Sequence, residues 1–430
     1  MLTLALVPLF GMIGLVTDFG YMHFIKMSAQ TAAEAAAQAA IIDFHASNAG
    51  SNYTCGSGGV VCAGTATTCA SNITTPANSL EHGCMYAQKH GFNGSNQWVT
   101  YQAGVSGIPA TVSGVSAASY WVTFIVMQKV PTMFSAVLGN MSSLVAARSS
   151  AALLGASDCI FALSPNASGA VNASGTAAIT SACGIMVDSS SASALSTNGT
   201  ATISAPEYDV HGGVSTHSPL SPTPNTGVAP VSDPLAGLAA PASAPYHCDY
   251  INYNAASWSN PTLSPGVYCG GINVKNNVYT LTTGTYILVG GGLSTQNSNS
   301  FIVGNGVTFY NTYGTTTNSG TYTYSPINLS ANSGVTLTAP NTGAYAGILI
   351  FEDRGAAENY DTYGGGSTAV YQGVIYAPHA DITMYGNSSV NCKYTMVVAN
   401  TVSLVGTTAF NNDYSLLPTG SPIQRVVLLE

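Results

Sequence analysis

The segment FEDRGAAENYDTYGG holds the one dense group of acidic side chains in the sequence. Its carboxylates are Glu352, Asp353, Glu358 and Asp361, with Arg354 beside them. Grouped carboxylates can bind calcium, or act as the acid and base of a glycoside hydrolase. No second acidic group complements them elsewhere in the chain. We therefore interpret the segment as a solvated loop and keep calcium binding by these four residues as the alternative.

Other patterns for catalysis or cofactor binding are missing. The eight histidines are scattered. Their nearest pairs, His211 with His217 and His379 with Asp381, are typical of surface or turn positions. There is no GxSxG, no P-loop and no HExxH motif. We expect no catalytic residue, no resident metal and no cofactor, so the sequence does not indicate an enzyme.

The cysteines indicate an oxidising compartment. None of the nine forms a CxxC pair, which argues against a zinc ribbon. In a chain of secreted composition, disulfides are the better interpretation. Sequence neighbours suggest pairing Cys159 with Cys183 and Cys248 with Cys269. Two further pairs are expected among Cys55, Cys62, Cys69 and Cys84. This would leave Cys392 free.

The composition excludes some partners. Only 6% of the 430 residues are charged, against about 25% in a typical soluble protein. The 17 acidic residues outnumber the 8 basic ones, so a nucleic-acid partner is not expected. Glycine, serine, threonine and asparagine replace the charges, as suits an extracellular β-rich protein. The 24 tyrosines are good strand residues, and stacking on a glycan ligand is the alternative.

The N-terminal segment must lie in an apolar environment. Residues 1–16 carry no charge, and the apolar run approaches the roughly 20 residues that span a bilayer. It is apolar on all sides, which predicts a site in lipid or one fully covered by protein. Pro8 would kink such a helix. No basic start or cleavage site is visible, so we expect a mature chain or one whose first residues are not shown. Membrane anchor and filament core both remain open.

The helix is expected to continue through an alanine-rich segment to Ala40 or Phe44. Alanine favours the helix and leaves a thin rod that other helices can approach closely. This predicts either contact between neighbouring copies or packing of the helix on its own domain. Asp18 stands where the apolar run meets the polar helix, and a carboxylate there would pair with a neighbouring copy or mark the membrane boundary.

The pattern LALVPLFGMIGLVTDFG…FIKMSAQTAAEAAAQAA resembles the N-terminus of TadE/TadG-like proteins of the tight-adherence (Flp) pilus system. Asp18 and Gly20 match the family's D-x-G motif, and the segment from Gln30 through Glu34 to Ala37 matches its second motif. AQKHGF, YWVTFIVMQKVPTMFSAVLG and VAARSSAALLG follow in the family's order. PLAGLAAP, LSPGVYCGGI, TGTYILVGGG and AYAGILIFEDR look like its long extracellular region. Type IV pilins carry an acid near position five, which this N-terminus lacks.

The chain divides into five expected parts. Residues 1–45 form the polymerisation or anchor helix, and 46–156 form a small α+β head. Residues 157–214 form β-rich coils, 215–247 a Pro-rich connector packed along the outside, and 248–430 a β-helix domain. In the last part a glycine followed by apolar or Thr/Tyr residues recurs, first at intervals of 18 and 22 residues. The repeats begin at Gly266, Gly284, Gly306, Gly347 and Gly373.

Repeats of this length predict a parallel β-helix, a right-handed solenoid that residues 157–214 would extend. The expected fold class is therefore α+β, with a long pilin-like helix, a small head and this solenoid. A β-sandwich is the alternative.

Two functions remain. The chain is either the structural subunit of an extracellular Tad-like filament, assembled through its N-terminal helix, or a membrane-anchored TadG-like accessory protein, minor pilin or adhesin. The expected partners are copies of the chain, the inner membrane before assembly, and a surface or glycan ligand. The expected location is the bacterial cell surface. The residues expected to make the assembly contacts are Met1, Ala5, Pro8, Phe10, Leu15, Asp18, Gly20, Ala33, Ala36 and Ala40.

Overall fold

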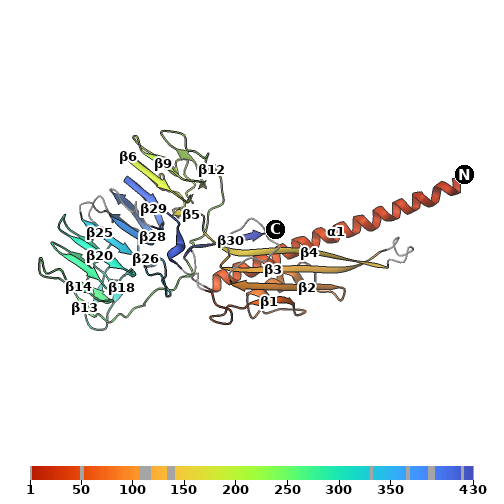
Figure 1. The fold of residues 1–430 in the computed structure, drawn as a ribbon, viewed down its shortest axis with the longest axis horizontal. Coiled ribbons are helices and arrows are strands. Elements are labelled where there is room, and N and C mark those ends of the chain that lie inside the picture. The colour runs from red at the N-terminus through yellow and green to blue at the C-terminus, as the bar shows by residue number, and fades with distance from the viewer. Residues whose placement is uncertain are drawn as a thin grey trace. The chain divides into compact units, whose positions relative to one another are not determined.

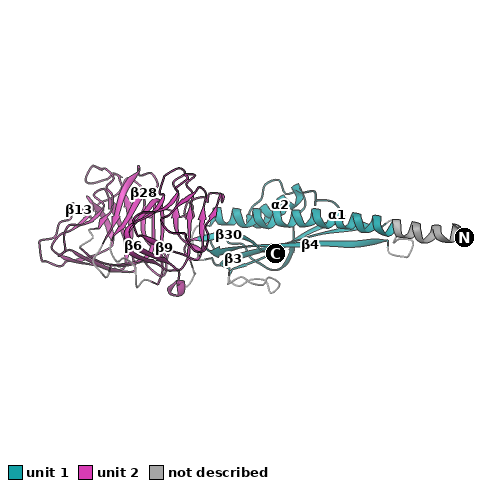
Figure 2. Ribbon diagram, turned by 90° about the horizontal axis from the view of Figure 1, so that it is seen from above, with its two compact units in different colours: residues 1–155, 424–430 teal, residues 156–423 magenta. Residues whose placement is uncertain are grey.

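The chain folds into two compact units, residues 1–155 with 424–430, and residues 156–423 (Figure 2). The structure is a computed structural model that describes residues 2–48, 53–105, 118–132, 141–329, 333–364, 369–385, 393–417 and 421–429. In the first helix, side chains are described from residue 14 onward. The five segment boundaries drawn from the sequence remain predictions.

The first unit combines two helices with an antiparallel sheet (Figure 1). The helices are α1 (Leu2–Ser47) and α2 (Ser79–Lys89). The sheet has the order β1-β2-β3-β4-β30. Its strands are β1 (Ala63–Thr68), β2 (Gln97–Val105), β3 (Tyr120–Pro131), β4 (Ser142–Gly155) and β30 (Gln424–Leu429).

Local sequence explains why α2 starts where it does. The Asn78 side chain accepts a hydrogen bond from the Glu81 backbone N–H at 3.0 Å. Glu81 in return accepts one from the Ala77 N–H at 2.8 Å. This reciprocal cap satisfies donors that a helix start leaves free. At the other end Gly91 takes φ +92°, a conformation that glycine adopts without strain.

The second unit is almost entirely β-structure. Its elements are β5 (Asp158–Ala162), β6 (Val171–Ser181), β7 (Gly184–Val187), β8 (Leu195–Thr197), β9 (Thr202–Ser204), β10 (Tyr208–Val210), β11 (Val214–Ser215), β12 (Asn225–Thr226), β13 (Tyr250–Ile251), β14 (Thr262–Leu263), β15 (Gly266–Cys269), β16 (Ile272–Val274), β17 (Val278–Leu281), β18 (Gly284–Val289), β19 (Leu293–Thr295), β20 (Phe301–Asn305), β21 (Val307–Thr312), β22 (Gly314–Thr315), β23 (Thr321–Tyr322), β24 (Asn328–Leu329), β25 (Gly334–Thr338), β26 (Ile348–Glu352), β27 (Asn359–Tyr363), β28 (Val370–Tyr385), β29 (Thr395–Phe410) and the 3-10 turn η2 (Tyr414–Leu416).

All of these strands except the small β22–β23 hairpin belong to one large sheet with parallel pairing. In the central part of this unit, each strand pairs with the strand three places later in the sequence, as in β15–β18, β16–β19 and β17–β20. The pairings therefore form three parallel ladders. The strands that start at or next to Gly266, Gly284, Gly306 and Gly347 are β15, β18, β21 and β26, and they pair in that order. Parallel pairing does not fit the β-sandwich alternative, whose sheets are antiparallel.

The last strands of the second unit pair with its first ones. Strand β29 lies parallel to both β5 and β6, so residues 157–214 share the large sheet with the later repeats. The chain enters this unit at Ala156 and leaves it at Ile423, whose carbonyl accepts the Ala156 N–H at 2.9 Å. In the first unit, Gly155 of β4 pairs with Gln424 of β30. The second unit is therefore an insertion between two adjacent strands of the first.

Tyrosines fill much of the second unit's core. Tyr250, Tyr268 and Tyr286 stack along one ladder, and Phe309 continues the row. The hydroxyl of Tyr286 donates to the Leu263 carbonyl at 2.9 Å, which satisfies a polar group that would otherwise be costly to bury. Many of the tyrosines are therefore core residues.

The Pro-rich connector, residues 215–247, contains β12 and is tied to the repeats by side chains. His211 contacts the Val228 carbonyl through Nδ1 at 2.7 Å, and Asp188 accepts the Val231 N–H at 2.9 Å. Further along, Arg354 donates to the carbonyls of Leu235 and Leu238. The connector is thus held against the second unit at successive points.

Candidate functional site on the N-terminal helix

One stripe of α1 packs against its own head. The buried positions follow helical spacing, which is expected of a helix lying on a sheet. They contact α2, β3 and β4. The fully buried members are Ala29, Ala32, Ala33, Ala36, Ala37, Ala40, Ile41 and Phe44.

Ala33, Ala36 and Ala40 were expected to contact neighbouring copies. Each is 0% exposed within a single chain, because the sheet and α2 cover it. Gly83 of α2 approaches so closely that a Cβ there would stand 2.9 Å from the Ala40 Cβ. The small side chains therefore serve close packing inside the head, which was the alternative interpretation of the alanine-rich segment.

The second family motif ties α1 to the sheet. Gln30 donates to Glu34 at 2.8 Å, one helical turn away, and also to the Arg148 carbonyl of β4 at 3.4 Å. The motif's polar residues thus fix the helix against β4 of the head, while its alanines fill the interface.

Asp18 lies on the same stripe as the alanines. It is only 6% exposed in the single chain, so its own chain covers it. Further along the helix, Ile25 packs with Val130 of β3 and Val145 of β4. Gly20 is exposed, and a Cβ added to it would meet open space. For Met1, Ala5, Pro8 and Phe10, the side chains lie outside the described residues.

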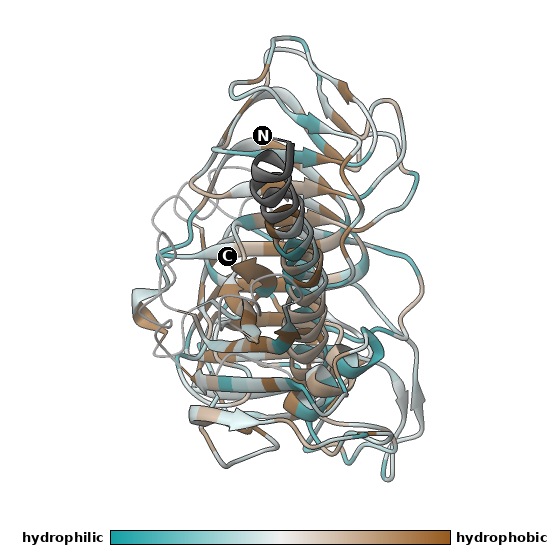
Figure 3. Cartoon of the chain, turned by 90° about the vertical axis from the view of Figure 1, so that its right-hand side faces the viewer, coloured by the Kyte–Doolittle hydropathy of each residue, from teal (hydrophilic) through white to brown (hydrophobic). Residues whose placement is uncertain are grey.

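The N-terminal part of the described helix is apolar and exposed on several sides. Figure 3 shows hydrophobic residues in brown along the described part of the helix. Phe19 and Phe24 are each 66% exposed and Val16 is 71% exposed. We call this set the apolar face, and it comprises Leu15, Val16, Phe19, Tyr21, Phe24 and Met27. Only Leu15 of this set was named from the sequence, although the high density of apolar residues in this segment was a usable signal for the others.

A surface of this kind is unfavourable in water. Six large apolar side chains within 13 helical residues leave a patch that soluble monomers rarely expose. Within the described residues, no helix combines the length and hydropathy needed to cross a membrane.

The four candidate calcium ligands do not converge. Glu352 and Asp361 are each 1% exposed and lie together in the core. Asp353 instead accepts hydrogen bonds from Tyr310 at 3.0 Å and Thr312 at 2.6 Å. Glu358 is exposed. Among the described residues, no three His, Cys, Asp or Glu side chains form a metal-binding group.

Glu352 and Asp361 form a buried acidic pair. Burial raises the pKa of Glu352, against which hydrogen bonds from Tyr324 and others act. Burial, and next the charge of Glu352, raise the pKa of Asp361 well above its usual range. Asp361 already accepts the Ile327 N–H and the Tyr363 hydroxyl, each at 2.9 Å. Like-charged carboxyls that cannot both ionise retain a proton, so this pair serves the core as a partly neutral hydrogen-bonded unit.

The histidine pairs named from the sequence do not form ligand sets. His211 contacts the connector, and the His217 N–H is bonded to Thr197. His379 is exposed, and Asp381 accepts hydrogen bonds from Asn400 and Thr401 instead.

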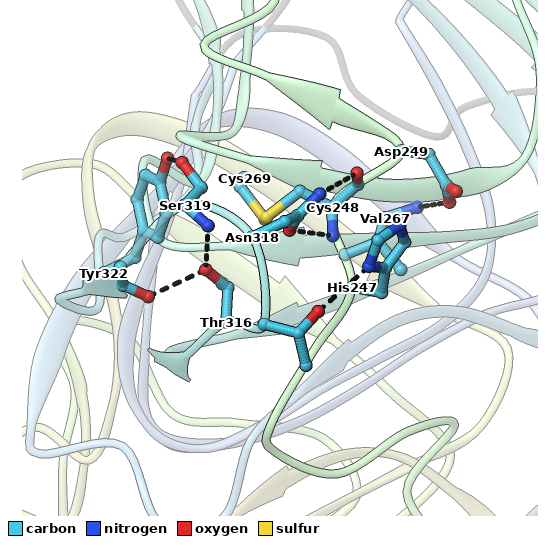
Figure 4. Close-up of a disulfide and its surroundings, with 11 residues drawn as sticks. His247, Cys248, Asp249, Val267, Cys269, Thr316, Asn318, Ser319 and Tyr322 are labelled. Carbon is cyan, nitrogen blue, oxygen red and sulfur yellow. Dashed lines mark hydrogen bonds between the residues drawn. A yellow bond between two sulfur atoms is a disulfide. The ribbon is translucent and has the colours of Figure 1, made fainter.

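The described residues contain four disulfides, including both pairs expected in the second unit. They are Cys55–Cys62, Cys69–Cys84, Cys159–Cys183 and Cys248–Cys269. Figure 4 shows that Asn318 brackets Cys248: its amide accepts the Cys248 N–H and donates to the Cys248 carbonyl, both at 3.0 Å. Cys392, expected to be free, lies outside the described residues.

The exposed face and the buried stripe together define a helix that is anchored in its head at one end and apolar at the other. Residues 1–49 match the family model of the putative Flp pilus-assembly TadE/G-like proteins. This confirms the resemblance for the segment that forms α1, and it associates the chain with pilus assembly at the cell surface. No curated protein and no solved structure matches the chain.

Proposed function

We propose that the chain is the structural subunit of an extracellular Tad-like filament, assembled through α1. The observation that carries this proposal is the apolar face, which a single chain leaves open to solvent. Copies of the same helix would bury it. A contact of one kind that repeats without closing gives an open helical fibre.

In this proposal the second unit is the part that the filament displays. Its three parallel ladders support a parallel β-solenoid, the finer form of the fold predicted from the glycine repeats. Its chain connections support display, because an insertion between β4 and β30 leaves α1 and the head intact as an assembly element. The proposed role needs no catalysis and no cofactor. The proposed route to the surface passes through the inner membrane, where lipid would cover the apolar face before assembly.

The alternative is a membrane-anchored TadG-like accessory protein, minor pilin or adhesin. The same apolar face favours it, since lipid can cover these side chains as well as another helix can. In the first proposal the mature chain is found in extracellular fibres, and in the alternative it stays in the membrane.

The proposal is tested by replacing Phe19 and Phe24 together with serine in the full chain. Phe19 and Phe24 do not belong to the head's core, so the head should keep its melting temperature. Fibre yield, measured by sedimentation and electron microscopy, should fall at least tenfold. Tyr360→Ser is the matched control, because Tyr360 is 77% exposed in the second unit. Unchanged fibres from the double variant would contradict assembly through α1. A chain found only as a membrane-bound monomer would support the accessory role.

A further inference from the structure

One face of the second unit is exposed, regular and uncharged. It is formed by β14, β17, β20, β25 and the start of β28, which pair in that order. Along these strands burial alternates, so every second side chain points outward. Among the described residues of this ladder, no outward side chain carries a charge. We call this surface the neutral face.

Parallel register places the outward side chains of the neutral face in rows. The central row crosses all five strands. Neighbouring members stand about 4.8 Å apart, as strands do. The central row consists of Thr262, Thr280, Val303, Thr336 and Val370. Asn305, Thr338 and Gln372 form a polar row on one side of it.

An apolar row lies on the other side of the centre. Val278 pairs with Phe301, which pairs with Gly334. The Phe301 ring lies against Gly334, where a Cβ would stand 2.6 Å from its Cε1 atom. A side chain at 334 would lift the ring, so this glycine lets an aromatic side chain lie low on the surface. Phe301 is 41% exposed and Val303 is 40% exposed.

Trp258 lies just beyond this row, two residues before Asn260, whose side chain accepts the Val278 N–H at 2.9 Å. The Trp258 backbone has φ +63°, which is unfavourable for a bulky residue, and its side chain is 65% exposed. The Trp258 N–H donates to the Asn276 carbonyl at 3.0 Å. The Asn277 side-chain amide donates to the Ala256 carbonyl and accepts a hydrogen bond from the Asn260 N–H. Backbone strain and an exposed indole each disfavour folding, and the neighbouring hydrogen bonds hold the strained backbone in place. Strain held in this way is a mark of functional positions.

We propose that the neutral face binds a neutral, ribbon-like polysaccharide. Sugar rings with equatorial substituents present flat C–H faces, which pack on aromatic and aliphatic side chains, and hydroxyl edges, which bond to hydroxyls and amides. The face offers both in parallel rows. It offers no cation for a polyanion, and the chain's net charge of −9 repels one. A lipid surface is disfavoured too, since such binding relies on basic residues around an apolar insert. The proposal does not depend on polymerisation through α1.

The test uses the full chain in mild detergent, mixed with microcrystalline cellulose or chitin. Protein left in solution after low-speed centrifugation is compared with a tube that lacks polysaccharide. Wild type should be depleted by at least one of the two polymers. Trp258→Ala should bind about 3- to 10-fold more weakly, as expected for the loss of one aromatic contact. Val303→Lys puts a charge at the centre of the face and should abolish binding, and Thr280→Lys is a second variant should that one fail to fold.

Tyr360→Ala is the control, because Tyr360 is an exposed aromatic residue on β27, in a different ladder. It should bind like wild type. The proposal is overturned if wild type binds neither polymer, or if all variants bind equally. It is also overturned if wild type is a dimer that binds neither polymer and Val303→Lys makes it a monomer. The face would then pair with a second copy of the chain.

Discussion

Gly83 of α2 lies against Ala36 of α1 so closely that a Cβ on Gly83 would stand 2.7 Å from the Ala36 carbonyl oxygen. Two small residues therefore set the distance between the helices of the head. The same alanine stripe that suggests contact between copies is used within one chain. This leaves the exposed apolar residues nearer the N-terminus of α1 as the surface available to partners.

Gly83→Ala should destabilise the head. Alanine would gain about 1 kcal/mol from helix propensity. The new methyl group, however, meets the Ala36 carbonyl, the Ala40 Cβ and the Phe124 ring, and overpacking of this kind costs about 1–3 kcal/mol. We expect a lower urea midpoint for the first unit. Gly20→Ala is the control, since nothing lies within 4 Å of its added Cβ. A midpoint that rises for Gly83→Ala would refute the close packing.

The acidic pair predicts how stability depends on pH. Glu352 and Asp361 have raised pKa values in the folded chain, so folding favours their protonated forms. This contribution is complete below their ordinary values of 4.5 and 3.8, and it is lost as pH rises through the folded values. Each unit of pKa shift corresponds to about 1.4 kcal/mol.

Glu352→Gln should therefore flatten the decline of the second unit's melting temperature between pH 4 and pH 8. Glutamine keeps the size of the side chain and can donate to Asp361 without a titrating proton. Glu358→Gln is the matched control, because Glu358 is exposed, and it should retain the wild-type slope. Parallel pH profiles for wild type and Glu352→Gln would show that the pair does not titrate as inferred.

The sequence predicts those features that depend on neighbours along the chain. The glycine repeats mark strands that pair in order, and the short cysteine spacings give the two disulfides of the second unit. The strand pairs and the disulfides each join residues that are about one repeat apart in the sequence. The α1 helix follows equally well from its alanine content and from the family motif.

Features that depend on distant pairing were not predictable in the same way. Small residues indicate close approach but not the partner, so the alanine stripe could not be assigned to the head. The pairing of β29 with β5 joins segments more than 200 residues apart, and no local pattern encodes it. The burial of Glu352 beside Asp361, with Asp353 turned to Tyr310, depends on which side of a strand each residue faces. A shift of one residue along a strand reverses the side that each residue faces.

Loss of either disulfide in the second unit should lower stability without changing its fold. Cys159–Cys183 and Cys248–Cys269 close segments of 24 and 21 residues. In the chain-entropy model each contributes about 3 kcal/mol. Replacing both cysteines of a pair with serine should lower the urea midpoint by a corresponding amount, and peptide mapping without reduction should recover both pairs from wild type. Free thiols at all four positions would contradict the proposed extracellular location.

Arg354 should control the attachment of the connector. Its Nη1 donates to the Leu238 carbonyl at 2.9 Å, its Nε donates to Tyr376 at 2.5 Å, and its guanidinium lies 5.0 Å from the centre of the Phe351 ring. Lysine keeps the charge but cannot hold several partners in one plane. Arg354→Lys should therefore free residues 233–240 and speed their cleavage by a nonspecific protease severalfold, with the β-strands still protected. Arg148→Lys is the control, because Arg148 is exposed on β4. Equal cleavage rates for wild type and Arg354→Lys would mean that the other contacts of the connector are sufficient to hold it.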